Sequence, residues 1–299
     1  MRIDLVAGLA LATVFSCAFV GRGEPVDAKV SLGARYTILV EGLDRDPLSA
    51  NRDRRSDLHT DTLVLLTSQI GSGVVSALHV PRDTRVFVPG NGWMKINQVL
   101  MSSGQNELRQ QLTHLTGLKV CATLQLDFER FRQVMRTIGP ISFAVDRAIA
   151  SPEGDAFVPP GRRKLSASEA LAVVRFRHEA LGDIGRVHRQ ERFLRQAVLV
   201  ASRLSMPMFA RAMRLADPGV PDAVVGRAYA LIHPLVRYEA RSVPGNFSVS
   251  GVSYWLADQE AMRQITAQIL SPTSAQSVFA QRIRARAYAD VDDGHDRSR

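Results

Sequence analysis

Cysteine is scarce in this chain of 299 residues, which contains two of them, Cys17 and Cys121. Cys17 lies in an apolar N-terminal stretch, so we expect no disulfide within the rest of the chain. Cys121, in LKVCATLQL, is expected to be a small buried side chain. No group of His and Cys residues has the spacing of a zinc site. The scarcity excludes a disulfide-rich scaffold, so the fold has to depend on its apolar core.

Internal repeats, low-complexity tracts and aromatic-rich basic motifs are missing as well. Aromatic residues make up 6% of the sequence, whereas the formal net charge is +9. The excess of positive charge predicts an anionic partner, which could be nucleic acid, a phosphate compound or an acidic membrane surface. The lack of a basic surface motif with interleaved aromatic residues argues against nucleic acid.

A single long apolar run stands near the N-terminus, from Leu5 to Gly21, with Arg2 before it and Arg22 after it. A basic start followed by an apolar run is typical of a secretory signal, and its length is also within the range of a transmembrane helix. We therefore predict that residues 1–24 form a signal peptide or a membrane anchor. Residues 25–34 are predicted to be a linker, 35–270 the main domain and 271–299 a polar tail. Either form of the leader places the domain outside the cytoplasm.

Strands and helices are interleaved along the predicted domain. Apolar runs predict strands in RYTILVEGLDRD, DTLVLLTSQ, VVSALHV, RVFV, VCATLQL (Val120 to Leu126) and ISFAVD, and a strand pair in FSVSGVSYWLAD, with a hairpin at Gly71 to Gly73. Helical spacing ends at Gly117, a second helix follows a cap at Asp127, and Ser166 starts a third. Further helices are expected from residue 185 onward. The mixture predicts an α/β fold of the mixed α+β kind, with a central mixed sheet flanked by helices.

Arginines gather between residues 172 and 191, in AVVRFRHEALGDIGRVHRQE. The side chains of interest are Arg175, Arg177, Arg186, Arg189 and Gln190. We expect VVRFR to be a strand, which would place its two arginines on one side. The other three residues share a face in the first turn of a helix beginning near residue 185. Because guanidinium groups bind phosphate oxygens in pairs, the cluster is a candidate oxyanion site. A solvated basic face is the alternative.

Three aspartates lie at the ends of predicted strands: Asp44 in GLDR, Asp61 in HTDT and Asp83 in PRDT. Carboxylates grouped at strand ends suit a hard cation such as Mg²⁺, which takes one or two carboxylates together with phosphate oxygens. For each aspartate the alternative is a role in a turn or a helix cap.

Eight motifs follow one another along the chain: ILVEGLDRD, HTDTLVLLTSQ, VPRDTRVFVPG, KINQVLMSSG, DFERFRQVMRTIGPISFAVD, LSASEALAVVRFRH, GDIGRVHRQERFL and SVSGVSYWLADQEA. In this order they resemble the LytR-CpsA-Psr family of cell-wall phosphotransferases. The resemblance runs from about Tyr36 to Leu270. Ordered motifs at family-like spacing are more specific than any one of them alone.

The resemblance implies a membrane-anchored enzyme on the extracytoplasmic face of the cytoplasmic membrane. Such an enzyme transfers a glycopolymer from a polyprenyl-pyrophosphate carrier to peptidoglycan as a phosphodiester, and an apolar cavity between sheet and helices holds the polyprenyl chain. It further implies Mg²⁺, with Mn²⁺ as the alternative, bound by Asp44 and Asp61. The implied pyrophosphate contacts are Arg175, Arg177, Arg186 and Gln190, to which we add Arg189.

The sequence departs from the family pattern before the second aspartate. His59 stands where members usually carry Arg, and the loop from Asp44 to Asp61 is longer than usual, with arginines of its own. We place His59 in the predicted pyrophosphate site. The predicted catalytic residues are Asp61, Arg82, Asp83 and Arg177, with Asp83 either the base or a turn residue.

Two other functions use nearly the same residues. A pyrophosphohydrolase would transfer the phosphate to water, and a non-catalytic regulator would only bind the lipid pyrophosphate, with His59 as the sign of lost catalysis. Metal-dependent turnover separates an enzyme from a binder, and a requirement for an acceptor separates a transferase from a hydrolase.

Overall fold

The computed structural model describes residues 34–43, 60–152, 154–176, 182–235 and 237–271. The predicted leader and nearly all of the predicted linker and tail lie outside these ranges, so their assignments stay predictions. Within the described ranges, no helix is both long and apolar enough to cross a membrane.

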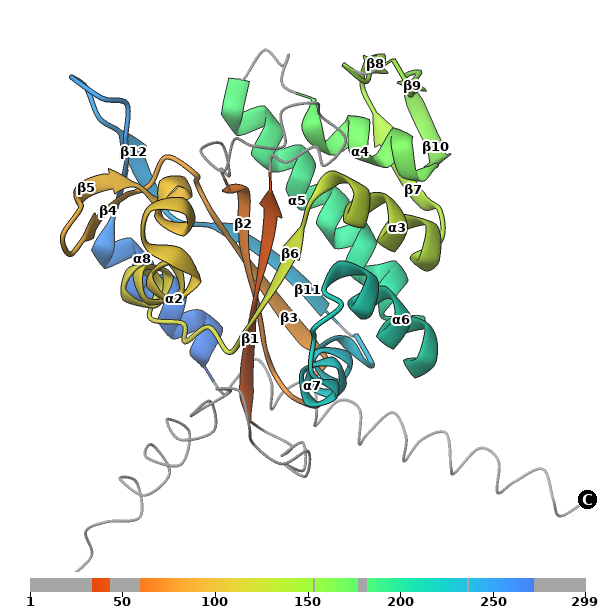
Figure 1. The fold of residues 1–299 in the computed structure, drawn as a ribbon, viewed down its shortest axis with the longest axis horizontal. Helices are drawn as coiled ribbons and strands as arrows, with labels where there is room; N and C mark the ends of the chain where they lie inside the picture. The colour runs from red at the N-terminus through yellow and green to blue at the C-terminus, as the bar shows by residue number, and fades with distance from the viewer. Residues whose placement is uncertain (1–33, 44–59, 153, 177–181, 236, 272–299) are drawn as a thin grey trace, which may run out of the picture.

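A five-stranded mixed sheet forms the centre of the domain (Figure 1), in the order β11-β3-β2-β1-β6. Its strands are β1 (Arg35–Leu43), β2 (Thr60–Gln69), β3 (Val74–Val80), β6 (Ala122–Leu126) and β11 (Arg237–Ser242). β2 pairs antiparallel with β1 and β3, whereas β6 and β11 pair parallel with β1 and β3. The inner strands are apolar along their length because both faces of the sheet are covered.

Helices cover both faces of the sheet (Figure 1). Ile38, Val64 and Ala77 face one core, whose helices are α5 (Gly182–Ala201), α6 (Met206–Ala216) and α7 (Asp222–Ile232). Leu39 and Leu78 face the other core, which is closed by α2 (Ile96–Thr116) and α8 (Gln259–Leu270). The two cores follow from the alternation of side chains along each strand.

A third apolar cluster extends the domain beyond the edge of the sheet. It contains α3 (Phe128–Ile138), α4 (Ala167–Arg175), β7 (Ile141–Val145) and β10 (Gly161–Leu165), with the short pair β8 (Ile149–Ala150) and β9 (Phe157–Val158). The predicted caps are confirmed. Asp127 accepts from the Arg130 N–H over 2.8 Å at the start of α3, and Ser166 and Glu169 form a capping box at the start of α4.

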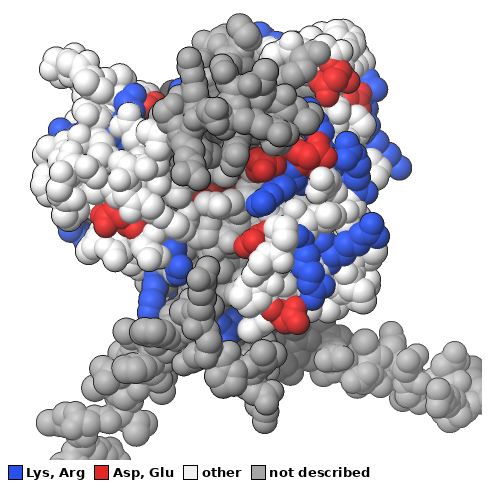
Figure 2. Space-filling view, in the orientation of Figure 1, with Lys and Arg blue, Asp and Glu red and all other residues white. Residues whose placement is uncertain are grey.

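Two hairpins are joined at one corner of the domain: β4 (Arg85–Val88) with β5 (Gly92–Lys95), and β12 (Gly245–Phe247) with β13 (Trp255–Ala257). A bridge between Thr84 and Trp255 connects them. Their exposed apolar side chains include Phe87, Trp93 and Phe247. Figure 2 shows this corner as largely uncharged.

The predicted fold class is confirmed, and so are the strand pair before α8 and the hairpin at Gly71 to Gly73. The prediction that VVRFR is a strand was wrong: α4 continues through Arg175, and Phe176 is its C-cap. The capping box starts a helix whose residues 170–173 are buried, and this packing outweighs the preference of valine for strands. α5 begins at Gly182, three residues before the predicted start, and five strands were not predicted: β5, β8, β9, β10 and β11.

Candidate functional site

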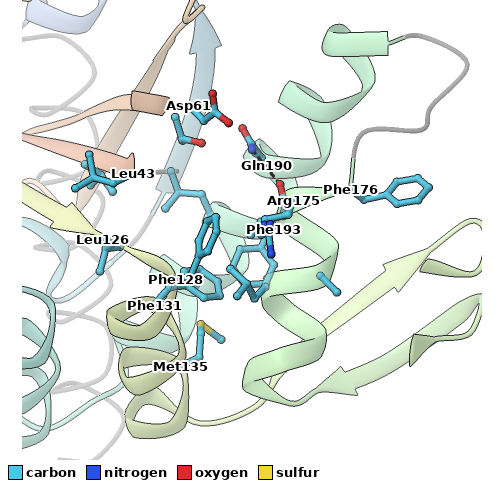
Figure 3. A pocket seen from close by; sticks show the side chains of 18 of the residues that line it. Leu43, Asp61, Leu126, Phe128, Phe131, Met135, Arg175, Phe176, Gln190 and Phe193 are labelled. Carbon is cyan, nitrogen blue, oxygen red and sulfur yellow. Dashed lines mark hydrogen bonds between the residues drawn. The ribbon is translucent and has the colours of Figure 1, made fainter. Parts of the chain in front are cut away.

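A cavity of about 620 Å³ lies between one face of the sheet and helices α3, α4 and α5. This volume is within the range of sites for small molecules and cofactors. Most of its lining is apolar, and the polar lining residues gather toward one end, as the view in Figure 3 shows. The cavity therefore suits an amphipathic ligand with a polar head and an apolar body.

The apolar body of the cavity is built mainly by α3 and α5. Phe128, Phe131 and Ile138 come from α3, while Leu194 and Ala197 come from α5. The α3 residues recur at helical spacing, yet most of that helix is only half-buried, because its apolar face borders the cavity. The space that these α3 side chains face is a cavity.

Four of the predicted site residues line the polar end, here called the mouth: Asp61, Arg175, Arg186 and Gln190. Figure 3 shows the side chains of Asp61, Gln190 and Arg175 at the same end of the cavity. The Arg186 side chain is buried, with 4% of its surface exposed. The Arg175 guanidinium lies over the Phe128 ring, 4.1 Å from its centroid, which orients it at the junction between mouth and body.

Asp61 is paired with Arg82 at the mouth. The Arg82 Nη1 donates to Asp61 Oδ1 over 2.9 Å. Arg82 also lies 3.9 Å from the carboxylate of Asp83, and the Lys95 Nζ contacts the same carboxylate at 2.7 Å. The turn at Pro81 is closed by the Thr84 N–H over 3.0 Å. Asp83 does not line the cavity, so its geometry favours a turn residue held by two cations over a proton acceptor.

Arg189 has a different place from the one predicted. Its Nε donates to the carbonyl of Val173 over 2.7 Å, and a second guanidinium nitrogen donates to the carbonyl of Phe176. The residue is almost fully buried, which lowers its pKa to about 10, and it is not part of the cavity lining. Its side chain holds the C-terminal end of α4 beside α5. Because α5 begins at Gly182, Arg186 and Arg189 lie beyond its first turn.

Gln190 both holds the end of α4 and lines the cavity. Its Nε2 donates to the carbonyl of Val174 over 3.0 Å, and its side chain also lines the cavity. The end of α4, and with it Arg175, is therefore fixed against α5 by two adjacent residues of that helix.

Three predicted site residues, Asp44, His59 and Arg177, lie outside the described residues. Of the predicted metal pair, the structure places Asp61. Among the described residues no three His, Cys, Asp or Glu side chains are grouped to hold a metal. A single carboxylate beside arginines nevertheless fits Mg²⁺, which takes most of its ligands from phosphate oxygens and water. Asp61 is the described residue that would hold it.

His79 lines the cavity and was not predicted as a site residue. It is 5% exposed, and burial lowers its pKa to about 4. The sequence signal is a polar residue that alternates with Val75 and Ala77 on one face of β3, two residues before the PRDT motif.

The sequence model of the LytR_cpsA_psr family matches residues 18–220. The match covers more than half of the chain, and this protein belongs to that family. The predicted resemblance is confirmed.

Several curated proteins are similar over part of the chain. The teichoic acid transferase TagU of Oceanobacillus iheyensis is 29% identical over 161 residues, which cover 51% of this chain and 50% of TagU. The probable cell wall biosynthesis protein LcpB of Corynebacterium glutamicum is 29% identical over 134 residues, 45% of this chain and 32% of LcpB. The regulatory protein MsrR of Staphylococcus aureus is 25% identical over 183 residues, 59% of this chain and 56% of MsrR. The chain thus spans between a third and just over half of these relatives.

Solved structures confirm the fold at lower identity. Bacillus subtilis TagV has a TM-score of 0.65 at 21% identity and covers 80% of this chain and 98% of its own. TagT with bound octaprenyl pyrophosphate lipid has a TM-score of 0.60 at 19% identity, covering 82% and 92%.

Proposed function

We propose that this protein transfers a glycopolymer from a polyprenyl-pyrophosphate carrier to peptidoglycan, forming a phosphodiester bond in cell-wall assembly. The observation that carries the proposal is the cavity: an apolar body of helix side chains opens at a mouth lined by Arg175, Arg186 and Asp61. A prenyl chain fits the body, and a pyrophosphate fits the arginines. The relative TagU is named a polyisoprenyl-teichoic acid–peptidoglycan teichoic acid transferase, which supports this reaction class. A TagT structure with bound octaprenyl pyrophosphate supports the lipid.

The arginines have a direct part in the proposed mechanism. Arg175 and Arg186 bind the pyrophosphate oxygens, and their positive charge stabilises the negative charge that develops as the phosphoryl group is transferred. An acceptor hydroxyl attacks the phosphorus nearest the glycan, and the lipid monophosphate leaves. We assign Arg177, beyond the described residues, to the same contacts. Mg²⁺ or Mn²⁺, when bound, would offset further charge on the phosphate oxygens.

Asp61 and Arg82 adjust the charge at the mouth. Asp61 would hold the metal, with Asp44 as its predicted second ligand, and the 2.9 Å contact with Arg82 orients the Asp61 carboxylate. The contact between Asp83 and Lys95 makes Asp83 a support for the turn that carries Arg82. We locate the reaction on the extracytoplasmic face of the cytoplasmic membrane, where the predicted leader would place the domain.

Turnover of a short prenyl-pyrophosphate disaccharide by the full chain in detergent tests the proposal. The reaction is run with and without Mg²⁺, in water alone and with peptidoglycan oligomers. Metal-dependent appearance of the disaccharide on the oligomer supports the transferase. Metal-dependent release without transfer would indicate a hydrolase. Binding without turnover would indicate a regulator, the class that the name of MsrR describes.

A matched pair of variants locates the reaction in the cavity. Arg175→Ala removes a mouth arginine, and Arg192→Ala removes an arginine from outside the cavity lining, whose side chain is 54% exposed. Both variants lose one positive charge. We expect the first to lose transfer and the second to retain it. Equal activity of the two variants would contradict the assignment of the mouth.

A further inference from the structure

His79 has a defined level on the sheet face that forms one wall of the cavity. The strand register places five residues side by side in one row: Leu124, Val40, Val64, His79 and Ser242. The row above contains Gly42 and Thr62, which line the cavity at the mouth. The row below consists of Ala122, Ile38, Leu66, Ala77 and Ala240.

On the sheet face, the lining of the cavity ends at the row of His79, and the apolar body continues between α3 and α5. Val40, Val64 and His79 line the cavity, whereas the residues of the row below belong to the packed core or lie beside it. His79 is therefore one row beneath the level of Thr62, which directly follows Asp61 in β2. This is the level at which the polar mouth meets the apolar body.

The His79 Nε2 atom is buried and makes no hydrogen bond to any of the described residues. Its neighbour Ser242 donates to Glu191 Oε1 over 2.9 Å, so that hydroxyl proton is engaged. A buried polar atom without a partner destabilises a folded protein. His79 itself lines the cavity, so rotation of its ring about χ2 would bring this nitrogen to the cavity, where a ligand can supply the missing bond.

The geometry points to His79 as a residue that binds the ligand. This inference rests on the proposed function. We propose that His79 is a positioning residue whose ring, turned so that an N–H faces the cavity, donates a hydrogen bond to the phosphate oxygen on the prenyl side of the bound pyrophosphate. The arginines of the mouth bind the oxygens farther out. This one fixed contact sets the depth to which the lipid enters the cavity.

The ionisation of His79 supports this role. Burial lowers its pKa to about 4, so the imidazole is neutral at pH 7 and carries one proton on its ring. A neutral donor orients a phosphate without adding to the positive charge of Arg175 and Arg186. The lipid monophosphate that leaves after transfer is therefore held less tightly at this level than a cation would hold it.

The experiment compares two His79 variants with a matched control in the full chain in detergent. His79→Phe removes the hydrogen-bonding nitrogen and keeps a flat ring, while His79→Gln restores an N–H donor. Tyr238→Phe is the control, because the Tyr238 hydroxyl is also buried and has no partner among the described residues, but Tyr238 does not line the cavity. Calorimetry measures binding of farnesyl pyrophosphate, farnesyl monophosphate and farnesol, and a thermal melt without ligand measures stability.

We expect His79→Phe to weaken both farnesyl phosphates about tenfold or more, which is the effect of losing one hydrogen bond to a charged group. Farnesol affinity should not change, His79→Gln should recover most of the loss, and Tyr238→Phe should bind like the wild type. The melting temperature of His79→Phe without ligand should equal or exceed that of the wild type, since an unsatisfied buried nitrogen is removed. A residue with a merely structural role would lower it.

Two outcomes would overturn the assignment of His79 and leave the proposed function standing. In one, the wild type and His79→Phe bind the farnesyl phosphates equally. In the other, His79→Phe loses farnesol affinity to the same extent, so that the ring acts only by packing. If the wild type binds neither farnesyl phosphate, the proposed function fails and the assignment fails with it.

Discussion

The Arg82 guanidinium donates to the Asp61 carboxylate over 2.9 Å, and this ion pair links β2 to the turn before β4 at the mouth of the cavity. The two side chains are 26% and 20% exposed. A pair that is partly in water contributes little to stability, about 1 kcal/mol or less. We therefore expect the pair to hold a carboxylate in a fixed orientation beside the proposed site for the pyrophosphate.

Asp61→Asn should separate charge from shape at this position. The amide keeps an oxygen for Arg82 but cannot bind a divalent cation as a carboxylate does. We expect transfer to fall by about 10²–10³-fold and its dependence on Mg²⁺ to disappear, because the charge on the phosphate is no longer offset. Rates across a Mg²⁺ titration measure this. Asp83→Asn is the control, and it should keep the Mg²⁺ response. An unchanged Mg²⁺ titration for Asp61→Asn would count against the metal assignment.

We expect Arg189 to contribute to the stability of the fold, whereas Arg186 contributes to ligand binding. Arg189→Met leaves the carbonyls of Val173 and Phe176 without their donor, and we expect a loss of about 2–4 kcal/mol in the free energy of unfolding. Arg189→Lys should restore little, because one ammonium cannot reproduce the planar fork. Urea denaturation measures both. A variant as stable as the wild type but unable to bind prenyl phosphate would return Arg189 to the pyrophosphate site.

The buried side chains of His79 and Glu41 should change the free energy of unfolding with pH in opposite directions. The folded-state pKa of His79 is about 4, below its ordinary value of 6.5. The unfolded chain then binds more protons, and stability should fall by roughly 2–3 kcal/mol as the pH drops from 6.5 to 4. The pKa of Glu41 is raised above 4.5 by burial, so its contribution is full below 4.5 and is lost as the pH rises through the raised value.

Melting curves across pH in two variants test this assignment. His79→Phe should remove the loss of stability on the acid side, and Glu41→Gln should remove the decline with rising pH. The Glu41 carboxylate accepts from Gln105 Nε2 over 2.6 Å and from Gln125 Nε2 over 2.8 Å, so the second variant is compared by slope and not by absolute stability. Slopes identical to the wild type in both variants would refute the assignment.

Gly104 should tolerate no side chain. It interrupts α2 with φ 83° and ψ 177°, a conformation that residues with a Cβ rarely adopt. Gly104→Ala should lower stability by about 1–3 kcal/mol. Gly226→Ala in α7 is the matched control, since that glycine is helical and a Cβ there meets open space, and it should raise stability by about 0.5–1 kcal/mol. Thermal melts of the two variants should shift in opposite directions.

Local signals in the sequence were sufficient for much of the fold. The cap at Asp127, the capping box at Ser166 and the C-terminal glycine at Gly117 each depend on neighbouring residues, and the structure confirms all three. The strand β11 is short of apolar residues, since it lies at the sheet edge and packs partly through Arg and Glu stems, so no pattern marked it.

The sequence predicted which residues lie together at the mouth where their charge alone grouped them. It missed the residues whose position depends on tertiary contacts. Arg175, Arg186 and Asp61 meet at the mouth as their chemistry suggested. The role of Arg189 depends on where the end of α4 lies, which no local pattern encodes. His79 resembles a core histidine until the register places it at the level where the cavity begins.

The intrinsic tryptophan fluorescence of the protein comes from the two joined hairpins. The chain contains two tryptophans, Trp93 in β5 and Trp255 in β13, and neither lines the cavity. Native fluorescence is therefore emitted from one corner of the surface, where the Trp93 indole is 58% exposed and Arg85 lies 4.5 Å above it. A prenyl phosphate that fills the cavity should leave this emission nearly constant, whereas a shift in wavelength marks contact between the hairpins and something outside the protein.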